Sequence, residues 1–200
     1  MRITLFLLAL LCTSPAALAG KTILIMGDSL SAGFGLRTEQ AWPSLLAQLL
    51  KEKQLDYSVA NLSISGETTA GGLSRLPPAL KQHKPELVVI ALGANDGLLG
   101  LPLTQMRDNL NAMINESKAS GARILLIGMR LPPNYGPYAD EFARTFNSVS
   151  RLHKTPLLDF LLEPIAQDQR YFLPDNLHPS AAAQPLILNH VWPALRALLK

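Results

Sequence analysis

A serine near the start of the chain and an aspartate–histidine pair near its end are residue types that nucleophilic acyl transfer uses. Ser29 stands in the string Gly27-Asp28-Ser29-Leu30, and Asp175 precedes His178 by three positions. On one turn of chain, this spacing lets the carboxylate reach Nδ1 of the imidazole and fix its tautomer, which leaves Nε2 free as a base. A serine hydroxyl is a weak nucleophile until such a base accepts its proton. The three residues predict a serine hydrolase whose catalytic groups are Ser29, His178 and Asp175.

Acyl transfer also needs an oxyanion hole, a set of hydrogen-bond donors for the negative oxygen of the tetrahedral intermediate. The candidates are the backbone N–H groups of Ser29 and Gly66 and the side-chain amide of Asn95. Each such donor typically lowers the barrier by about 3 kcal/mol. Ser29 also has a simpler interpretation, because Ser and Asp are both favoured at helix N-caps. The hydrolase prediction therefore depends on whether these distant segments meet.

The hydrophobic pattern predicts the elements that would bring these segments together. Short apolar runs indicate buried strands, and apolar residues at three-and-four spacing indicate the helices between them. The expected strands are residues 23–26, 57–61, 87–92, 124–127 and, with a weaker pattern, 155–160; the expected helices are 38–53, a segment ending at 84, 102–120 with Thr104 as its cap, 139–152 and 179–199. This alternation predicts an α/β fold with one parallel sheet covered on both faces, which places the loops at 27–29, 65–66 and 93–96 at the same edge.

Apolar residues in the loops near this edge predict a groove for a fatty-acyl chain. The expected substrate-binding residues are Leu30, Leu98, Leu99, Leu131, Asn134 and Tyr135. Asn134 and Tyr135 have two interpretations, since they either line the pocket or brace their loop. Asp28 and Asp96 are expected to stabilise turns rather than to take part in the chemistry.

Residues 1–19 have the pattern of a cleaved secretory signal peptide. Arg2 precedes a short apolar run, and Ala17-Leu18-Ala19 supplies a small-x-small cleavage site. The apolar run is shorter than the roughly 20 residues that span a bilayer. We therefore expect a mature chain that begins near Gly20, a single domain over residues 20–200, no stable membrane insertion, and a periplasmic or secreted location.

Composition narrows the possible partners. Cleavage would remove Cys12, the one cysteine of the sequence, and with it any disulfide, thiolate metal site or cysteine nucleophile. The histidine spacing indicates no metal site. The net charge of +3 comes without a basic block, which argues against a nucleic-acid partner. No feature of the sequence reports the oligomeric state, and a monomer is the default expectation.

Four short motifs, taken together, resemble the SGNH (GDSL) hydrolase family. They are Gly27-Asp28-Ser29-Leu30, Gly66, Gly93-x-Asn95-Asp96 and Asp175-x-x-His178-Pro179. The similarity covers essentially the whole mature chain, and it is closest to the bacterial periplasmic branch known as thioesterase I, lysophospholipase L1 or arylesterase. It implies a flavodoxin-like three-layer α/β/α sandwich with a five-stranded parallel sheet, no metal or organic cofactor, and hydrolysis of small-molecule acyl esters or thioesters, lysophospholipids among them. The loop after Gly136 departs from the pattern of this branch, which leaves the preferred acyl length open.

Other functions on a flavodoxin-like sheet are less consistent with these residues. A phosphoacceptor receiver domain needs a pair of acids after the first strand, whereas the sequence offers only Asp28 there. A non-catalytic binding module has no need of the Asp175–His178 pair. A carbohydrate O-deacetylase or a non-catalytic binding module on the same scaffold is the alternative, although a deacetylase would be expected to carry aromatic platforms, and aromatic residues make up only 6% of the chain.

Overall fold

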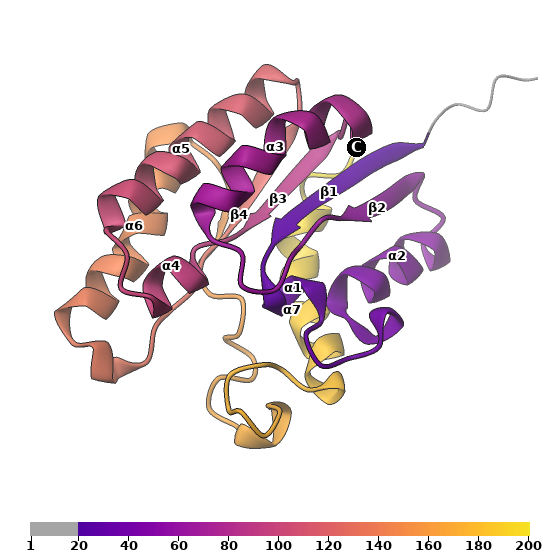
Figure 1. The fold of residues 1–200 in the computed structure, drawn as a ribbon. Helices are drawn as coiled ribbons and strands as arrows, with labels where there is room; N and C mark the ends of the chain where they lie inside the picture. The colour runs from indigo at the N-terminus through magenta and orange to yellow at the C-terminus, as the bar shows by residue number, and fades with distance from the viewer. Residues whose placement is uncertain (1–19) are drawn as a thin grey trace, which may run out of the picture.

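The apolar runs form one parallel five-stranded sheet in the computed structural model, which describes residues 20–200 (Figure 1). The strand order is β2-β1-β3-β4-β5, and every neighbouring pair is parallel. The strands are β1 (Lys21–Gly27), β2 (Tyr57–Asn61), β3 (Leu87–Ala91), β4 (Arg123–Ile127) and β5 (Leu157–Leu158). The predicted α/β fold class, with its flavodoxin-like strand order, is confirmed.

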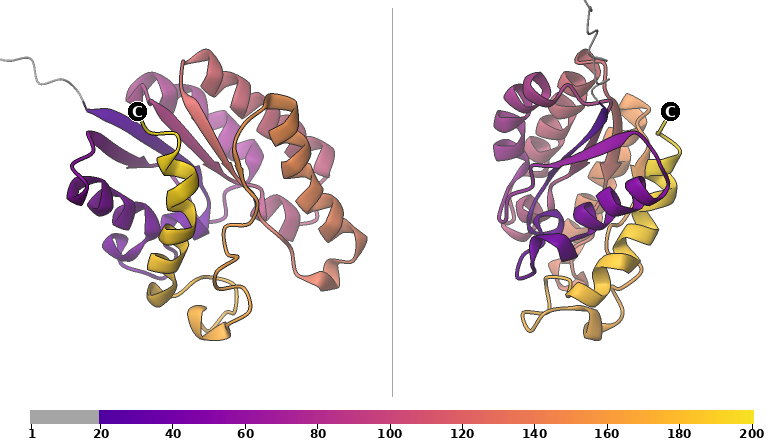
Figure 2. Two further views of the ribbon diagram at one scale, coloured as in Figure 1. Left: turned by 180° about the vertical axis from the view of Figure 1, so that it is seen from behind. Right: turned by 90° about the vertical axis from the view of Figure 1, so that its right-hand side faces the viewer.

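Successive residues of β1 point into two different cores. Ile23 and Ile25 pack on the face covered by α2 (Trp42–Glu52) and α7 (Gln184–Arg196). Leu24 and Met26 pack on the opposite face, which α3, α5 and α6 cover. Because neighbouring side chains of a strand alternate between its faces, a strand that is buried on both sides is apolar throughout. The three layers are seen from behind and from the side in Figure 2.

The helices of the second face are α3 (Thr69–His83), α5 (Leu103–Ala119) and α6 (Pro137–His153). Their positions agree with the predicted segments to within a few residues. The prediction that Thr104 caps α5 is wrong, because the residue before the helix is Pro102 and no side chain caps it. Thr104 lies inside the first turn instead, where its backbone already follows the helix.

Three other segments differ from the expectation. The single helix predicted over 38–53 is split into a short 3₁₀ turn (Thr38–Gln40) and α2, whose first turn contains Pro43. A proline in the first turn of a helix costs no hydrogen bond, because the N–H groups there have no partner within the helix; Pro43 therefore favours the start of a separate helix. The last helix begins at Gln184 rather than at Pro179, after the 3₁₀ turn Ala181–Ala183. The fifth strand is reduced to Leu157–Leu158 at the edge of the sheet.

A further short helix, α4 (Ala94–Leu98), lies where the sequence suggested only a loop. It starts directly after Gly93, whose φ of 118° is accessible to glycine because glycine lacks a Cβ. The helix carries Asn95 and Asp96, so the motif after β3 is held in regular structure rather than in a free loop.

β1 lies at the topological switch point of the sheet, because β2 and β3 flank it on opposite sides. Ligands of open α/β sheets bind beyond the carboxyl ends of the strands at such a point. The short helix α1 (Ser29–Ala32) begins there (Figure 1). The predicted signal peptide, residues 1–19, lies outside the described residues. Among residues 20–200, each helix is too short or too polar to cross a membrane.

Candidate active site

The end of β1 places Ser29 at the first position of α1. Asp28 is the N-cap of this helix, and its Oδ1 accepts a hydrogen bond from the Leu30 N–H at 3.0 Å. A Cβ on Gly27 would come within 2.8 Å of both Ser31 Cβ and Ser63 Oγ, so the turn requires glycine there. The capping role that serine often takes belongs to Asp28, which leaves the Ser29 hydroxyl available for other contacts.

The Ser29 hydroxyl meets His178, although the two residues lie 149 positions apart in the sequence. Ser29 Oγ is 2.9 Å from His178 Nε2, and His178 Nδ1 is 2.8 Å from Asp175 Oδ2. With the carboxylate accepting from Nδ1–H, Nε2 is left as the acceptor that faces the hydroxyl. The three predicted catalytic residues are therefore brought together in one hydrogen-bonded series.

Asp175 also holds the backbone of its own turn. Its Oδ1 accepts from the N–H groups of Leu177 and His178, each at 2.9 Å. These backbone hydrogen bonds, first that from His178, lower the pKa of Asp175 from 3.8 to about 2, and the bond from the His178 ring lowers it further. Asn176, the residue after Asp175, has a φ of 55°, a left-handed conformation that Asn tolerates well. One carboxylate thus sets both the turn and the ring orientation.

An aromatic ring covers the imidazole from the other side of the site. Phe34 and His178 have ring centroids 4.3 Å apart with an interplanar angle of 32°. Phe34 follows Gly33, which ends α1 in the left-handed conformation. Phe34 is 46% exposed, so its contact with His178 lies at the mouth of the site rather than in the core.

Gly66 and Asn95 line the same cavity as Ser29 and His178. Gly66 has a φ of 80°, and Asn95 Nδ2 donates to the carbonyl oxygen of Glu67 at 2.9 Å. An amide nitrogen carries two hydrogens, so this bond fixes the amide plane and leaves one N–H for another acceptor. The predicted oxyanion donors therefore converge on the cavity that contains the serine hydroxyl.

Asp96 anchors the segment that carries Asn95. The side chain is 2% exposed, and it accepts from the N–H and from Oγ1 of Thr69 at 2.9 and 2.5 Å. Asn109 Nδ2 donates in turn to Thr69 Oγ1 at 3.0 Å. The predicted structural role of Asp96 is confirmed, and the partner it binds is the beginning of α3.

Asp28 is the second buried carboxyl group of the site, with an exposure of 2%. Burial, which disfavours the charged form, raises its pKa from 3.8 to about 6, although the hydrogen bond from Leu30 and the proximity of His178 act in the opposite direction. A carboxyl group with this pKa changes its charge in mildly acidic solution, one residue before Ser29.

Two adjoining cavities share part of their lining. The first has a volume of about 190 Å³ and is lined by Leu30 and Leu98 together with Ser29 and His178. The second, of about 420 Å³, shares four lining residues with the first, namely Ala94, Leu98, Met129 and Leu177. Leu131 lines only the second cavity. Together they form an apolar-walled depression that begins at Ser29.

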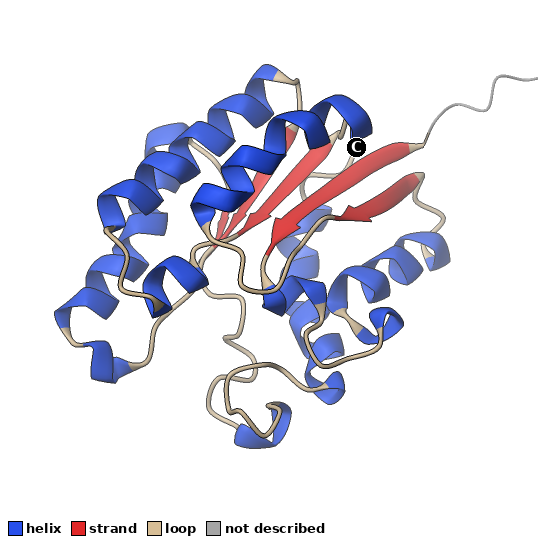
Figure 3. Cartoon of the chain, in the orientation of Figure 1, coloured by secondary structure: helices blue, strands red, loops and turns tan. Residues whose placement is uncertain are grey.

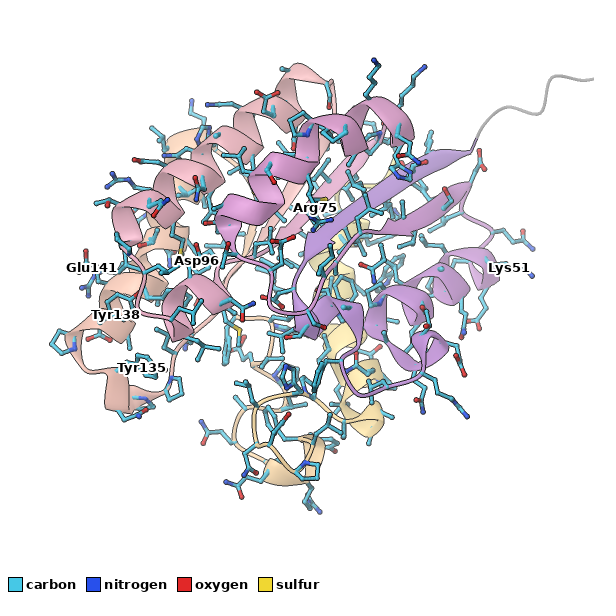
Figure 4. All side chains as sticks on the ribbon, viewed as in Figure 1. Lys51, Arg75, Asp96, Tyr135, Tyr138 and Glu141 are labelled. Atoms are coloured by element: carbon cyan, nitrogen blue, oxygen red, sulfur yellow. The ribbon has the colours of Figure 1, made fainter. Side chains whose placement is uncertain are left out.

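The other three expected substrate-binding residues line neither cavity. Leu99 is 67% exposed, and Asn134 lies exposed in the 3₁₀ turn Pro133–Tyr135. Tyr135 donates its hydroxyl to the Leu98 carbonyl at 3.4 Å, and Tyr138 donates to the Leu101 carbonyl at 2.8 Å (Figure 4 labels both tyrosines). Of the two interpretations of Tyr135, the contact favours bracing.

Met129 and Leu177 line both cavities, yet neither was singled out from the sequence. A signal for each was present. Met129 follows β4 at the same edge as the catalytic loops, and Leu177 is an apolar residue inside the Asp175–His178 turn. Within residues 20–200, no group of three His, Cys, Asp or Glu side chains is placed to hold a metal ion.

Comparisons with known proteins agree with this geometry. The model of the GDSL-like lipase/acylhydrolase family matches residues 25–185. The chain is 48% identical over 182 residues to Esterase TesA of Pseudomonas aeruginosa, with 90% of each chain covered. It is 40% identical over 195 residues to the thioesterase 1/protease 1/lysophospholipase L1 of Escherichia coli K12, covering 97% of this chain and 92% of that protein.

Solved structures show the same similarity. The crystal structure of TesA superposes with a TM-score of 0.87 over 90% of this chain and all of that one. The esterase EstA from Pseudoalteromonas sp., solved in a form inhibited by monoethylphosphonate, has a TM-score of 0.85 and 41% identity, with 88% and 97% of the two chains covered. The resemblance inferred from four short motifs is confirmed.

Proposed function

The chain belongs to the GDSL-like lipase/acylhydrolase family and is a carboxylic ester hydrolase; we propose that Ser29, His178 and Asp175 form its catalytic triad. The observation that carries this assignment is the 2.9 Å contact between Ser29 Oγ and His178 Nε2. Nucleophile and base within hydrogen-bond reach, with the base oriented by a third group, is the arrangement that activates a serine.

In the proposed reaction, Ser29 Oγ attacks the substrate carbonyl carbon while its proton passes to Nε2 of His178. The electron pair of the C=O bond moves onto oxygen, which accepts hydrogen bonds from the N–H groups of Ser29 and Gly66 and from the Asn95 amide. Asp175 stabilises the imidazolium that forms. When the intermediate collapses, the bond to the leaving oxygen or sulfur breaks, and His178 gives that atom the proton.

Water completes the turnover. His178 removes a proton from a water molecule that attacks the acyl-serine carbonyl, and the second tetrahedral intermediate uses the same donors. Its collapse breaks the bond to Ser29 Oγ, which takes the proton back from His178. The products are the free acid and the original hydroxyl, so no cofactor is required by this scheme.

We propose an acyl chain as the group that the depression binds. Its walls include Leu30, Leu98, Met129 and Leu177. Two of the large apolar side chains that stay exposed among residues 20–200, Phe34 and Leu177, also line the first cavity. This placement supports a flexible hydrocarbon substrate, for which lysophospholipids and long-chain esters are the natural candidates outside the cytoplasm.

Covalent labelling tests the nucleophile. A fluorophosphonate probe should modify Ser29 in the wild-type protein and leave the Ser29→Ala variant unlabelled, because only an activated serine reacts with it. Peptide mapping that finds the label elsewhere would refute the triad. A matched series of para-nitrophenyl esters from two to sixteen carbons tests the acyl groove, and kcat/KM that falls steadily beyond the shortest ester would remove it.

We also propose that the protein is exported and that its mature form is a monomer. N-terminal sequencing of the protein from its host should find Gly20 first if residues 1–19 are a cleaved signal peptide. Light scattering of the mature protein would measure its mass directly.

A further inference from the structure

A largely buried ion pair lies directly beside Gly66 and Asn95, the two proposed oxyanion donors that do not belong to α1. Arg75 of α3 donates from Nε to Glu67 Oε2 at 2.7 Å, and the side chains are 30% and 12% exposed (Figure 4 labels Arg75). Glu67 is the residue after Gly66. The proposed acyl transfer does not use the charge of Arg75 or that of Glu67, so the ion pair has another role.

Arg75 joins the two ends of the loop that carries Gly66. Its Nη1 donates to the Leu62 carbonyl at 3.0 Å, while its Nε holds Glu67. Leu62 follows β2, and Glu67 lies just before α3. The planar fork of arginine can make both bonds at once, which the single ammonium of lysine cannot do with the same geometry. The third nitrogen, Nη2, is buried without a hydrogen-bond partner among the described residues. The bonds to Glu67 and Leu62 therefore keep the guanidinium in this position at the cost of one unpaired donor.

Glu67 is also the joint between the two donors. Its backbone carbonyl accepts from Asn95 Nδ2 at 2.9 Å, and its N–H donates to the Ile64 carbonyl at 3.1 Å. A shift of Glu67 would therefore move the Asn95 amide and the peptide of Gly66 together.

Gly66 is exposed, and no neighbouring group fills the space where a side chain would lie. A Cβ built on Gly66 would meet no atom within 4 Å, and its φ of 80° lies in the left-handed region. Such a peptide depends on hydrogen bonds and ion pairs of its neighbours for its orientation. By contrast, Gly27 on the Ser29 side of the site is enclosed by Ser31 and Ser63.

We propose that Arg75 and Glu67 are positioning residues that hold the Gly66 N–H and the Asn95 amide at the oxyanion, an inference that rests on the proposed function. Neither side chain touches the reacting atoms. Because an oxyanion hole works only when its donors are fixed before the reaction, loosening this loop should lower kcat more than it raises KM.

Arg75→Met tests the proposal, since methionine keeps an apolar stem and removes the fork. We expect kcat to fall by about 10- to 100-fold, because a misplacement of the oxyanion donors by about 1 Å can cost up to about 100-fold in rate. KM should change by less than about threefold. Affinity for a boronic acid analogue, which mimics the tetrahedral intermediate, should fall in parallel with kcat/KM. Arg75→Lys should recover part of the loss. Wild-type kcat in Arg75→Met would overturn the proposal.

The chain offers a matched control at the opposite edge of the sheet. Arg123 pairs with Glu86 at 2.9 Å and donates to the Leu198 carbonyl, so it too joins a carboxylate and a backbone oxygen. Arg123→Met should lose stability without changing kcat of the folded enzyme. If the two variants lower kcat by the same factor, Arg75 has a general structural role and the proposal is wrong.

Gly71 provides a test that does not weaken the fold. A Cβ on Gly71 would lie 1.9 Å from Glu67 Oε1, so Gly71→Ala must push the carboxylate aside. Alanine in place of glycine favours the helix, and Gly71 lies in α3. We expect a variant that melts no lower than the wild type but has a reduced kcat. An unchanged kcat together with unchanged analogue affinity would count against the proposal.

A readout that does not depend on turnover separates this proposal from the proposed function. In ¹H–¹⁵N spectra, the Gly66 amide and the Asn95 side-chain amide should both shift and exchange faster with solvent in Arg75→Met than in Arg123→Met. If wild-type Ser29 fails to react with a fluorophosphonate while these amides respond as described, the triad is wrong, and what remains of the proposal is that the ion pair orients the two amides. Unshifted amides would refute the positioning role even if the triad is correct.

Discussion

The two sides of the hydrogen bond between Ser29 and His178 are built in different ways. Ser29 follows β1, whose residues Ile23 to Met26 are fully buried between the two helical layers. His178 lies on the long segment between β5 and α7, most of which is loop (Figure 3). Packing against the core sets the position of the serine, whereas local hydrogen bonds set that of the histidine.

The hydrogen bonds of the histidine side are specific and few. His178 accepts at its carbonyl from the Leu173 N–H at 2.8 Å, and Ser180 donates its N–H to the Tyr171 carbonyl at 2.7 Å. The buried side chain of Gln184 ties the start of α7 to the Trp42 N–H at 2.9 Å. Substitutions on the histidine side should therefore change activity with little effect on stability, whereas those on the serine side can change both.

The largest expected effect removes the nucleophile itself. Ser29→Ala should lower kcat by at least about 10⁴-fold, because the remaining donors can bind an oxyanion but cannot form the acyl-enzyme. The free energy of unfolding should change by less than about 0.5 kcal/mol, since the hydroxyl bonds only to His178 among the described residues. Ester hydrolysis and urea denaturation measure the two quantities. A variant with near-normal turnover would refute the triad.

Asp175→Asn tests the histidine side. The amide cannot accept from Nδ1–H through the nitrogen that replaces Oδ2, so the imidazole loses its orientation and the charge that stabilises imidazolium. We expect kcat to fall by about 10²- to 10⁴-fold. The melting temperature should hardly change, because the Asp175 side chain is 39% exposed and belongs to a turn. A strong loss of stability would break the contrast between the two sides.

Asp28→Asn tests how the serine side responds to pH. The folded-state pKa of about 6 lies above the ordinary value of 3.8, so the folded protein binds this proton more tightly than the unfolded chain does. Stability is therefore lost as pH rises from about 4 through about 6, by about 3 kcal/mol for a difference of about two pKa units. Asparagine carries no charge and keeps the acceptor for the Leu30 N–H.

The measurement for Asp28 is a comparison of two curves. The free energy of unfolding of Asp28→Asn, relative to the wild type, should increase by about 2.5 kcal/mol between pH 4 and pH 8. Other titrating groups cancel in this difference. Parallel curves for the two proteins would mean that the buried carboxyl group has an ordinary pKa.

Phe34→Ala should have the smallest effect, because it removes the aromatic contact between the two sides without removing a catalytic group. Aromatic contacts of this kind contribute about 0.5–1.5 kcal/mol, so kcat should fall by about 2- to 10-fold. Phe34 is 46% exposed, and stability should be nearly unchanged. Phe34→Leu is the matched control, which keeps apolar volume. If both variants behave like the wild type, the ring has no part in holding His178.

The two sides also differ in how much of their structure could be predicted from the sequence. β1 and the position of Ser29 beyond it followed from an apolar run and a glycine, since a strand buried on both faces leaves a clear pattern. The short α4 was missed because its five residues contain a glycine and lie within a loop-like composition, and Gly93 supports it through a backbone conformation that no periodicity reports. Leu99 was expected in the groove as a loop leucine, yet an apolar residue's type does not indicate which way it points.

The chemistry available to this protein can be read from its amino-acid sequence: a serine after a buried strand, an Asp-x-x-His pair, and an amide and a glycine at the ends of other strands. Local spacing is enough to identify these groups, because Asp175 and His178 share one turn and the end of each apolar run marks the end of a strand. The sequence does not reveal that Ser29 meets His178, that Arg75 bridges the ends of the Gly66 loop, or that Leu99 is exposed, and these depend on how the chain packs. These contacts join residues whose separation along the chain carries no information about distance, and the packing of two cores on one sheet sets them.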